Sequence, residues 1–192
     1  MTLRSSADVT HGETAHGLPV TPLLTDTLCT KCGLCCDGTL FADVELVGQA
    51  EIARLEIMGM DIENEPRNMG VLSQPCSALR GTRCGIYAHR PKCCRVFQCH
   101  LLQNAQRGAV TVDRALEQIA NTREQIRQLR AMLDRLGNHD EDLPIKERCD
   151  ETLAKEGGTP SEIKGRADLA AAMTALENTI WNSFLGSGKR RG

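Results

Sequence analysis

The sequence predicts an α+β fold, mostly α, in which a small cysteine-rich domain of short strands and loops is followed by an α-helical hairpin. Two observations predict this arrangement. Nine of the ten cysteines lie within residues 22–108, whereas residues 109–186 carry apolar side chains at helical spacing. The ends of the chain differ from both parts. Residues 1–21 are rich in Ser, Thr, His and Gly, which indicates a disordered arm, and residues 187–192 form a basic tail.

The cysteine-rich domain is expected to contain short elements. We expect strands at 39–41 and 44–46, a helix at 49–58, a loop at 64–83 and a helical turn at 86–90. Apolar residues at helical spacing that end before a glycine indicate the helix. The prolines and glycines of residues 64–83 indicate a loop, because these residues favour turns over regular structure.

Residues 112–136 carry the clearest periodicity in the chain. One set of residues recurs every seven positions, and a second set repeats with the same period, offset by three. They are Val112, Ile119, Ile126 and Leu133, and Ala115, Thr122, Leu129 and Leu136. A dimerising coiled coil is one interpretation of this four-heptad seam. We favour a helix that packs on its own domain or on the C-terminal helix, because four heptads are near the minimum for a coiled coil.

A second amphipathic helix is expected to begin at Pro160. Thr159 and Glu162 form a capping box around this proline, which occupies the first helical position. Apolar residues follow along one face of the helix. They are Leu169, Met173, Leu176, Ile180 and Phe184. Two amphipathic helices can bury each other's apolar faces as an antiparallel hairpin, which we expect within residues 109–186.

Four thiols lie within eight residues, in the run Cys29-Thr-Lys-Cys32-Gly-Leu-Cys35-Cys36. The first three reproduce the C-x2-C-x2-C spacing of bacterial ferredoxins, which suits a metal or iron–sulfur site. Those ferredoxin runs continue with x3-C-P, whereas Thr39 stands at that position here. A fourth ligand must therefore be Cys36 or a distant residue.

Five distant cysteines lie in the same domain. They are Cys76, Cys84, Cys93, Cys94 and Cys99. Their spacing contains no second C-x2-C step, which argues against a zinc ribbon. Adjacent cysteines do not easily pair with each other, which favours metal ligation over a disulfide framework. A metal would also hold down the loop at 64–83, so we expect a metal-stapled domain.

The apolar pattern predicts a cytoplasmic protein without a membrane partner. Residues 1–20 contain no apolar run that resembles a signal-peptide core. The chain also contains no run of 18 apolar residues, so no transmembrane helix is expected. A reducing cytosol keeps thiols free, which again favours metal ligands over disulfides.

Residues 66–112 contain no Asp or Glu, although the whole chain has a net charge of −2. Seven basic residues lie in this stretch. They are Arg67, Arg80, Arg83, Arg90, Lys92, Arg95 and Arg107. We favour the interpretation that they offset the negative charge of thiolates, because they interleave with the cysteines. An anion-binding face for nucleic acid is the alternative. Only Tyr87 and Phe97 could stack on bases there, so nucleic acid is not the expected partner.

Other donors in the chain contribute less to the prediction. His89 and His100 flank the later cysteines and could be ligands of a mixed site, or simply polar neighbours. Cys149 lies in a charged helical stretch, and we expect it to be a free thiol. The sequence shows no dinucleotide fingerprint, phosphate loop or Ser/His/Asp pattern, so it assigns no enzymatic activity.

Taken together, four motifs resemble the YkgJ-like cysteine cluster family, whose signature is CxxCxxCC. They are the run from Cys29 to Cys36, then Pro75-Cys76, then Cys84-Gly-Ile-Tyr87, and finally Arg90-Pro91 with the following Cys94-Arg95-x-Phe97-x-Cys99. The resemblance covers about residues 24–102. It implies a zinc- or iron-chelating domain with eight family cysteines, and it leaves Cys93 and Cys149 as extras. The eight are Cys29, Cys32, Cys35, Cys36, Cys76, Cys84, Cys94 and Cys99.

Several hypotheses follow for the function. The favoured one is a cytoplasmic metal-binding protein that holds an iron–sulfur cluster, with 4Fe-4S preferred because the related flagellin lysine methylase carries a similar motif with a four-iron cluster. The alternative is a zinc-binding structural or interaction module, in which the helices of residues 109–186 bind a protein partner or form a homodimer. A thiol redox protein is less favoured, because no βαβ setting is evident around the C-x2-C step.

Overall fold

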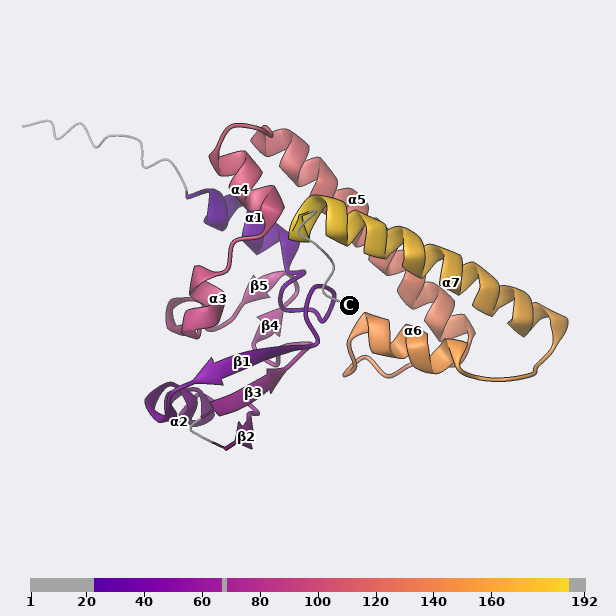
Figure 1. The fold of residues 1–192 in the computed structure, drawn as a ribbon, viewed down its shortest axis with the longest axis horizontal. Coiled ribbons are helices and arrows are strands. Elements are labelled where there is room, and N and C mark those ends of the chain that lie inside the picture. Colours follow the sequence, from indigo (N-terminus) through magenta and orange to yellow (C-terminus); the bar gives the residue numbers. More distant parts are fainter. Residues whose placement is uncertain (1–22, 67–68, 187–192) are drawn as a thin grey trace, which may run out of the picture.

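The computed structural model describes residues 23–66 and 69–186, so the predicted arm at 1–21 and the basic tail at 187–192 lie outside the described residues. The fold is α+β and mostly α, as the sequence predicts. Figure 1 shows a small sheet with a helix against it at one end of the molecule and long helices that extend away from it. None of the helices in the described part of the chain is both long and apolar enough to cross a membrane.

Short strands build the sheet part. Strand β3 (Met69–Ser73) lies at the centre of a three-stranded antiparallel sheet, with β1 (Asp43–Val47) on one side and β2 (Glu63–Glu65) on the other. Helix α2 (Gln49–Ile57) packs against this sheet through the buried Ile52 and Leu55, close to the bounds expected from the sequence.

A second group of short elements connects the sheet part to the helices. Strands β4 (Leu79–Arg80) and β5 (Arg83–Cys84) form an antiparallel hairpin. The 3-10 turn η1 (Tyr87–His89) follows and agrees with the helical turn expected at 86–90. Helix α3 (Lys92–Val96) comes directly after it.

Two of the sequence expectations for this region are wrong. Residues 39–41 form no strand, and the expected loop at 64–83 contains most of β2 together with β3, β4 and the start of β5. Gly70 explains part of the error. A Cβ atom at this position would lie 2.9 Å from the side chain of Ile62, so the glycine allows close packing within the sheet. Its neighbour Leu72 on the same face of β3 is also buried.

The remaining elements are helical. They are α1 (Leu24–Cys32), α4 (His100–Gln106), α5 (Val112–Arg135), α6 (Ile145–Leu153), α7 (Pro160–Ile180) and the π-helical turn η2 (Trp181–Leu185). Helices α5 and α7 lie side by side and antiparallel, as the predicted hairpin requires (Figure 1). The capping box is present: the Thr159 hydroxyl accepts a hydrogen bond from the Glu162 amide, and the Glu162 carboxylate accepts one from the Thr159 amide at 2.7 Å.

The heptad seam of α5 packs within the chain, as the favoured interpretation predicts. All eight seam residues are buried or partly buried against α1, α4, α6 or α7. Fully buried positions include Ala115, Thr122 and Leu129. The Thr122 hydroxyl donates to the Gln118 carbonyl at 2.8 Å, so this polar seam residue is satisfied within its own helix.

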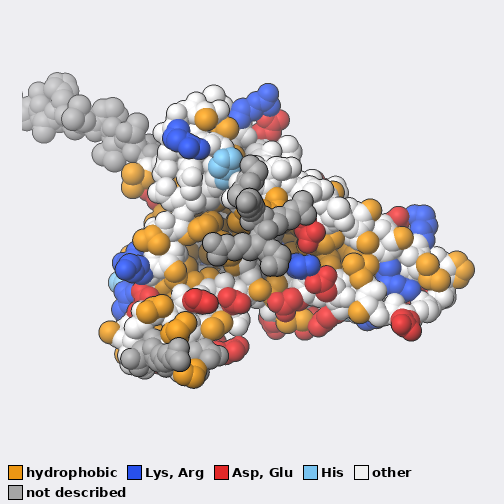
Figure 2. Space-filling view, in the orientation of Figure 1, with side chains coloured by type: hydrophobic (Ala, Val, Ile, Leu, Met, Phe, Trp, Pro, Cys, Tyr) orange, Lys and Arg blue, Asp and Glu red, His pale blue; other side chains and the backbone are white. Residues whose placement is uncertain are grey.

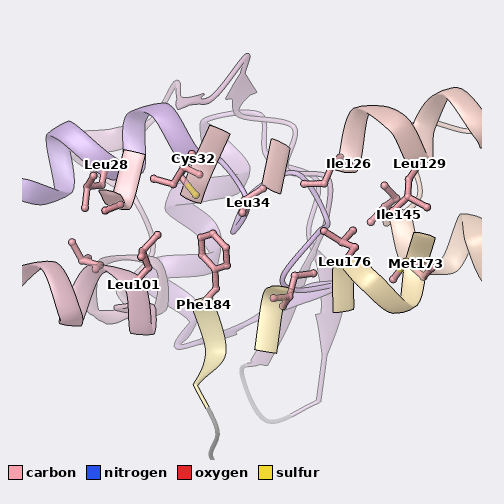
Figure 3. Packing of buried hydrophobic residues seen from close by; sticks show 14 of the residues in the cluster. Leu28, Cys32, Leu34, Leu101, Ile126, Leu129, Ile145, Met173, Leu176 and Phe184 are labelled. Atoms are coloured by element: carbon pink, nitrogen blue, oxygen red, sulfur yellow. The ribbon is translucent and has the colours of Figure 1, made fainter. Parts of the chain in front are cut away.

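Buried side chains form two separate clusters. The helical core contains 18 buried residues contributed by α1, α4, α5, α6, α7 and η2, together with Leu34. Figure 3 shows Phe184 in this core among Cys32, Leu34 and Leu101. The sheet core contains seven buried residues, contributed by β1, α2, β3 and the segments that flank them. The elements that carry most cysteines lie where these two cores approach each other (Figure 1).

Candidate metal centre

Nine cysteines line a single cavity of about 340 Å³. They are Cys29, Cys32, Cys35, Cys36, Cys76, Cys84, Cys93, Cys94 and Cys99. The cavity therefore brings together all eight cysteines implied by the family resemblance. Cys149, in contrast, is fully buried in the helical core and does not line the cavity. In Figure 2, hydrophobic side chains, a class that includes cysteine there, gather between the sheet part and the long helices.

Helix α1 supplies the first wall of the cavity. Cys29 and Cys32 are three residues apart on a helix, so their side chains lie on the same face. The helix ends at Gly33, which adopts a left-handed conformation with φ of +75°. A Cβ atom on Gly33 would lie 3.2 Å from Thr82 Cα, so glycine also permits the close approach of the β4–β5 hairpin. The turn that follows carries Cys35 and Cys36 into the cavity.

The β4–β5 hairpin and the residues before it supply the second wall. The Cys76 amide donates a hydrogen bond to the Cys36 carbonyl at 2.8 Å, which joins the two cysteine-bearing segments directly. The Leu79 amide donates to the Cys76 carbonyl, and Leu79 is the partner of Cys84 in the hairpin register. The Thr82 hydroxyl donates to a carbonyl of α1 at 2.6 Å. These bonds hold the second wall against the end of α1.

Helices α3 and α4 carry the remaining cysteines that line the cavity. Cys93 and Cys94 lie in the first turn of α3. Cys99 is the N-cap residue of α4, where its sulfur accepts a hydrogen bond from the Leu102 amide at 3.5 Å. Between these two helices the Phe97 ring meets Phe41 edge to face at a centroid distance of 5.0 Å.

Burial keeps the thiols along α1 protonated. It raises the pKa of Cys29 to about 11 and that of Cys32 to about 12, and it raises the pKa of Cys35 well above the usual range. Repulsion from a Cys99 thiolate adds to the increase at each of the three. A cation in the cavity would favour the thiolate form, so metal uptake would release protons.

The pKa values of the other thiols in the cavity are shifted in both directions. Burial, followed by repulsion from Cys76 and Cys84, raises the pKa of Cys36 to about 12. Burial also raises the pKa of Cys76. A hydrogen bond between the side chains of Cys93 and Cys94 lowers the pKa of Cys93 to about 7 and raises that of Cys94.

Arg90 supplies positive charge at the cavity. Its guanidinium lies 3.6 Å from the centroid of the Tyr87 ring, and its Nε donates to the Tyr87 carbonyl at 3.1 Å. The guanidinium lowers the pKa of both Cys29 and Cys36, although burial outweighs this effect. Arg95 also lines the cavity. Two of the seven basic residues singled out in the sequence thus lie in the wall of the cavity.

Sequence reasoning missed the contribution of the long helices to the cavity. The guanidinium of Arg123, on α5, donates to the Cys32 carbonyl at 2.9 Å. Ile119 of α5 and Phe184 of η2 line the cavity beside the thiols. Helical periodicity marks Ile119 and Phe184 as core positions, but no local signal indicates which distant segment they meet.

The donor set fits zinc or iron by its chemistry, because thiolates are preferred ligands of both zinc and iron–sulfur clusters. The two candidate histidines, His89 and His100, do not line the cavity. Among residues 23–66 and 69–186, no three Cys, His, Asp or Glu side chains are gathered closely enough to hold a metal ion directly. The sulfurs lie along the walls, so ligation would draw them inward.

A partly buried cavity lined by thiols defines a protein of the metal-chelating class. The chain belongs to the CxxCxxCC family, described as a "putative zinc- or iron-chelating domain": the family model matches residues 28–125, just over half of the chain. The match extends past residue 102, where the resemblance noted in the sequence ends, and includes Arg123 of α5. Comparison with curated proteins and with solved structures found no match.

Proposed function

We propose that this protein is a cytoplasmic metal-binding protein that binds an iron–sulfur cluster in the thiol-lined cavity. The proposed ligands are the thiolates of Cys29, Cys32, Cys35, Cys36, Cys76, Cys84, Cys94 and Cys99. The ten free cysteines of the structure suit a reducing compartment, which supports the cytoplasm as its location.

The size of the cavity is the observation that carries the proposal. A single water molecule needs only about 10–15 Å³ of such volume, so about 340 Å³ is far more than one ion requires. A four-iron cluster is a multi-atom group that holds its thiolates further apart than a single zinc ion does. Thiols spread along the walls of a roomy cavity therefore favour a cluster over one directly coordinated ion.

Anaerobic purification tests this proposal. The full chain, expressed with sufficient iron and kept free of oxygen, is expected to be brown and to contain iron and acid-labile sulfide in equal amounts. A matched Cys149→Ala variant should give the same spectrum, because Cys149 lies in the helical core and not in the cavity. A colourless protein that is fully loaded with zinc alone would contradict the iron–sulfur assignment.

A zinc-binding structural module is the second candidate. The position of the thiols favours it, because they lie between two separate cores and a structural ion would hold these together. In this case the outer faces of α5 and α7 would form a surface for a protein partner, and Ile163 on α7 is an exposed apolar residue there. This candidate would be supported if the purified protein contained zinc, lacked iron and kept its full helical structure.

A further inference from the structure

A groove of about 590 Å³ runs along helix α5 beside the end of α1. It shares only Ile119 with the lining of the thiol cavity, so it is a separate feature of the surface. Lys31, in the last turn of α1, and Asp37, in the turn that follows, form one side. The other lining residues all belong to α5. They are Leu116, Ile119, Ala120, Arg123, Glu124, Ile126, Arg127 and Arg130.

The groove is positively charged, whereas the whole chain has a net charge of −2. Four basic and two acidic side chains line it, which leaves a net charge of +2. The basic residues are Lys31, Arg123, Arg127 and Arg130. Within the described part of the chain, neither Lys31 nor Arg123 has a carboxylate at ion-pair distance. Both charges can therefore pair with an acidic group from outside.

The other two arginines have acidic partners but remain accessible. Arg127 pairs with Glu124 on the preceding turn of α5, and Arg130 Nη2 lies 3.9 Å from Asp37 Oδ2. The side chains of Arg127 and Arg130 are 76% and 44% exposed, so these pairs face water. Ion pairs in water are weak, and an incoming carboxylate can join them.

The shape of the groove suits an extended ligand. Spacings of three or four residues place Arg123, Arg127 and Arg130 along one side of α5. From Leu116 to Arg130 the helix rises about 21 Å at 1.5 Å per residue. An extended peptide advances about 3.3 Å per residue, so about six residues would follow the whole groove. A single small anion would contact only part of it.

The chemistry of the lining favours a peptide over a nucleic acid. The buried Ile119 and Ile126 lie among the charged residues and can receive apolar side chains. A peptide can place its carboxylates at the arginines and neutral residues opposite Asp37 and Glu124. A nucleic acid carries a phosphate at every nucleotide and cannot avoid these acids. None of the residues that line the groove is aromatic, so bases would have no stacking surface there.

We propose that this groove binds an extended segment of a partner protein that alternates acidic and apolar residues. The inference goes beyond metal binding and holds whichever metal the cavity takes. Arg123 connects the groove to the candidate metal centre, because its guanidinium also donates to the Cys32 carbonyl at 2.9 Å. A partner in the groove therefore lies directly beside the helix that carries Cys29 and Cys32.

Fluorescence anisotropy with the full chain tests the inference. The probe is a fluorescein-labelled hexapeptide that alternates glutamate and leucine, and a control peptide carries glutamine in place of each glutamate. The acidic peptide should bind and should lose affinity as the salt concentration rises, whereas the control peptide should not bind. This comparison uses the wild type alone, so it does not depend on the folding of any variant.

Matched variants locate the binding site. Lys31→Gln and Arg127→Gln should each weaken binding about two- to fivefold, and the double variant about tenfold. Arg114→Gln should bind like the wild type, because it removes a charge from the same helix but outside the groove. Arg123 is left unchanged, since its hydrogen bond to Cys32 also supports the end of α1. Circular dichroism and metal content should be the same in all of these proteins.

Three results would overturn the inference while leaving metal binding intact. One is an acidic peptide that does not bind at low salt, or that binds the double variant as tightly as the wild type. Another is a labelled single-stranded oligonucleotide that binds more tightly than the peptide and is weakened by the same substitutions, which would assign the groove to nucleic acid. The third is self-association of the wild type that the double variant loses, which would assign the groove to a second copy of the chain.

Discussion

The helical core and the sheet core differ in how much apolar surface they bury. The helical core combines 18 buried residues on helices that include α5 with 24 residues and α7 with 21. The sheet core has seven buried residues under strands of three to five residues. Burial is the main favourable contribution to folding, so the larger core can stabilise itself whereas the smaller one needs additional support. Thiol ligation at the boundary would supply that support.

Removing the metal should give the largest contrast between the two parts. Chelation under reducing conditions is expected to increase amide exchange in β1, β3 and the β4–β5 hairpin, because the metal holds these segments to the helices. The amides of α5 and α7 should stay protected. Hydrogen–deuterium exchange read by mass spectrometry measures both parts in one sample. Unchanged protection of β3 after complete removal of metal would show that the sheet core is stable by itself.

A cavity mutation in each core should separate the two stabilities. Leu129→Ala removes a fully buried side chain from the helical core and should lower the free energy of unfolding by about 2–5 kcal/mol. Leu46→Ala makes a matched change in the sheet core, where Leu46 is also fully buried. Urea unfolding followed by helical dichroism should detect the first change, whereas the second should mainly accelerate exchange in β1 and β3. Equal effects of both variants on the helical signal would indicate one cooperative unit.

The pH dependence of stability should change sign with metal. In the metal-free protein, burial raises the pKa of Cys29 to about 11 and that of Cys32 to about 12, above about 8.5 for a thiol in an unfolded chain. Their contribution to stability is complete below about pH 8.5 and is lost as the pH rises through 11 to 12. The metal-bound protein carries thiolates, so its stability should instead fall as the pH drops below about 8.5.

Urea unfolding at pH 7.5 and pH 10, with and without metal, measures this difference. The Cys149→Ala background is the suitable control, because burial also raises the pKa of Cys149 to about 11 and this thiol is independent of the cavity. Parallel pH slopes for the two forms would mean that the cavity thiols do not change protonation when metal binds.

The smallest expected effect lies at the far end of the helical hairpin. Thr159→Ala removes the capping box of α7 and should lower stability by about 0.5–2 kcal/mol. Metal content should not change, because Thr159 does not line the cavity. Thermal unfolding together with metal analysis tests both statements, and loss of metal in this variant would connect the hairpin to the centre more closely than the packing indicates.

Local patterns in the sequence predicted the two long helices, α5 and α7, whereas α1, α3 and α4 were not expected. The heptad seam of α5 and the cap of α7 are signals that lie within one element, so they could be found without knowledge of the fold. The strand expected at 44–46 is β1, but β2 and β3 were missed because they are short and because Gly70 indicates a loop, although it serves close packing against Ile62. The sequence around a residue does not show which other segment will pack against it, so this kind of requirement cannot be predicted locally.

The candidate site shows the same limit. Its cysteines were found from their spacing and from the family motifs, and all eight line the cavity. The hydrogen bond from Cys76 to Cys36 could not be predicted, because it joins segments that are far apart in the chain. The contact of Arg123 with Cys32 was missed for the same reason.

One feature of the fold concerns the order in which the protein is made. Phe184 in η2 lines the cavity beside the thiols, although every cysteine of the cavity precedes it by most of the helical region. A ribosome therefore releases the complete set of thiols long before the residue that closes the wall next to them. A metal could therefore reach the thiols before the turn that carries Phe184 completes the wall beside them.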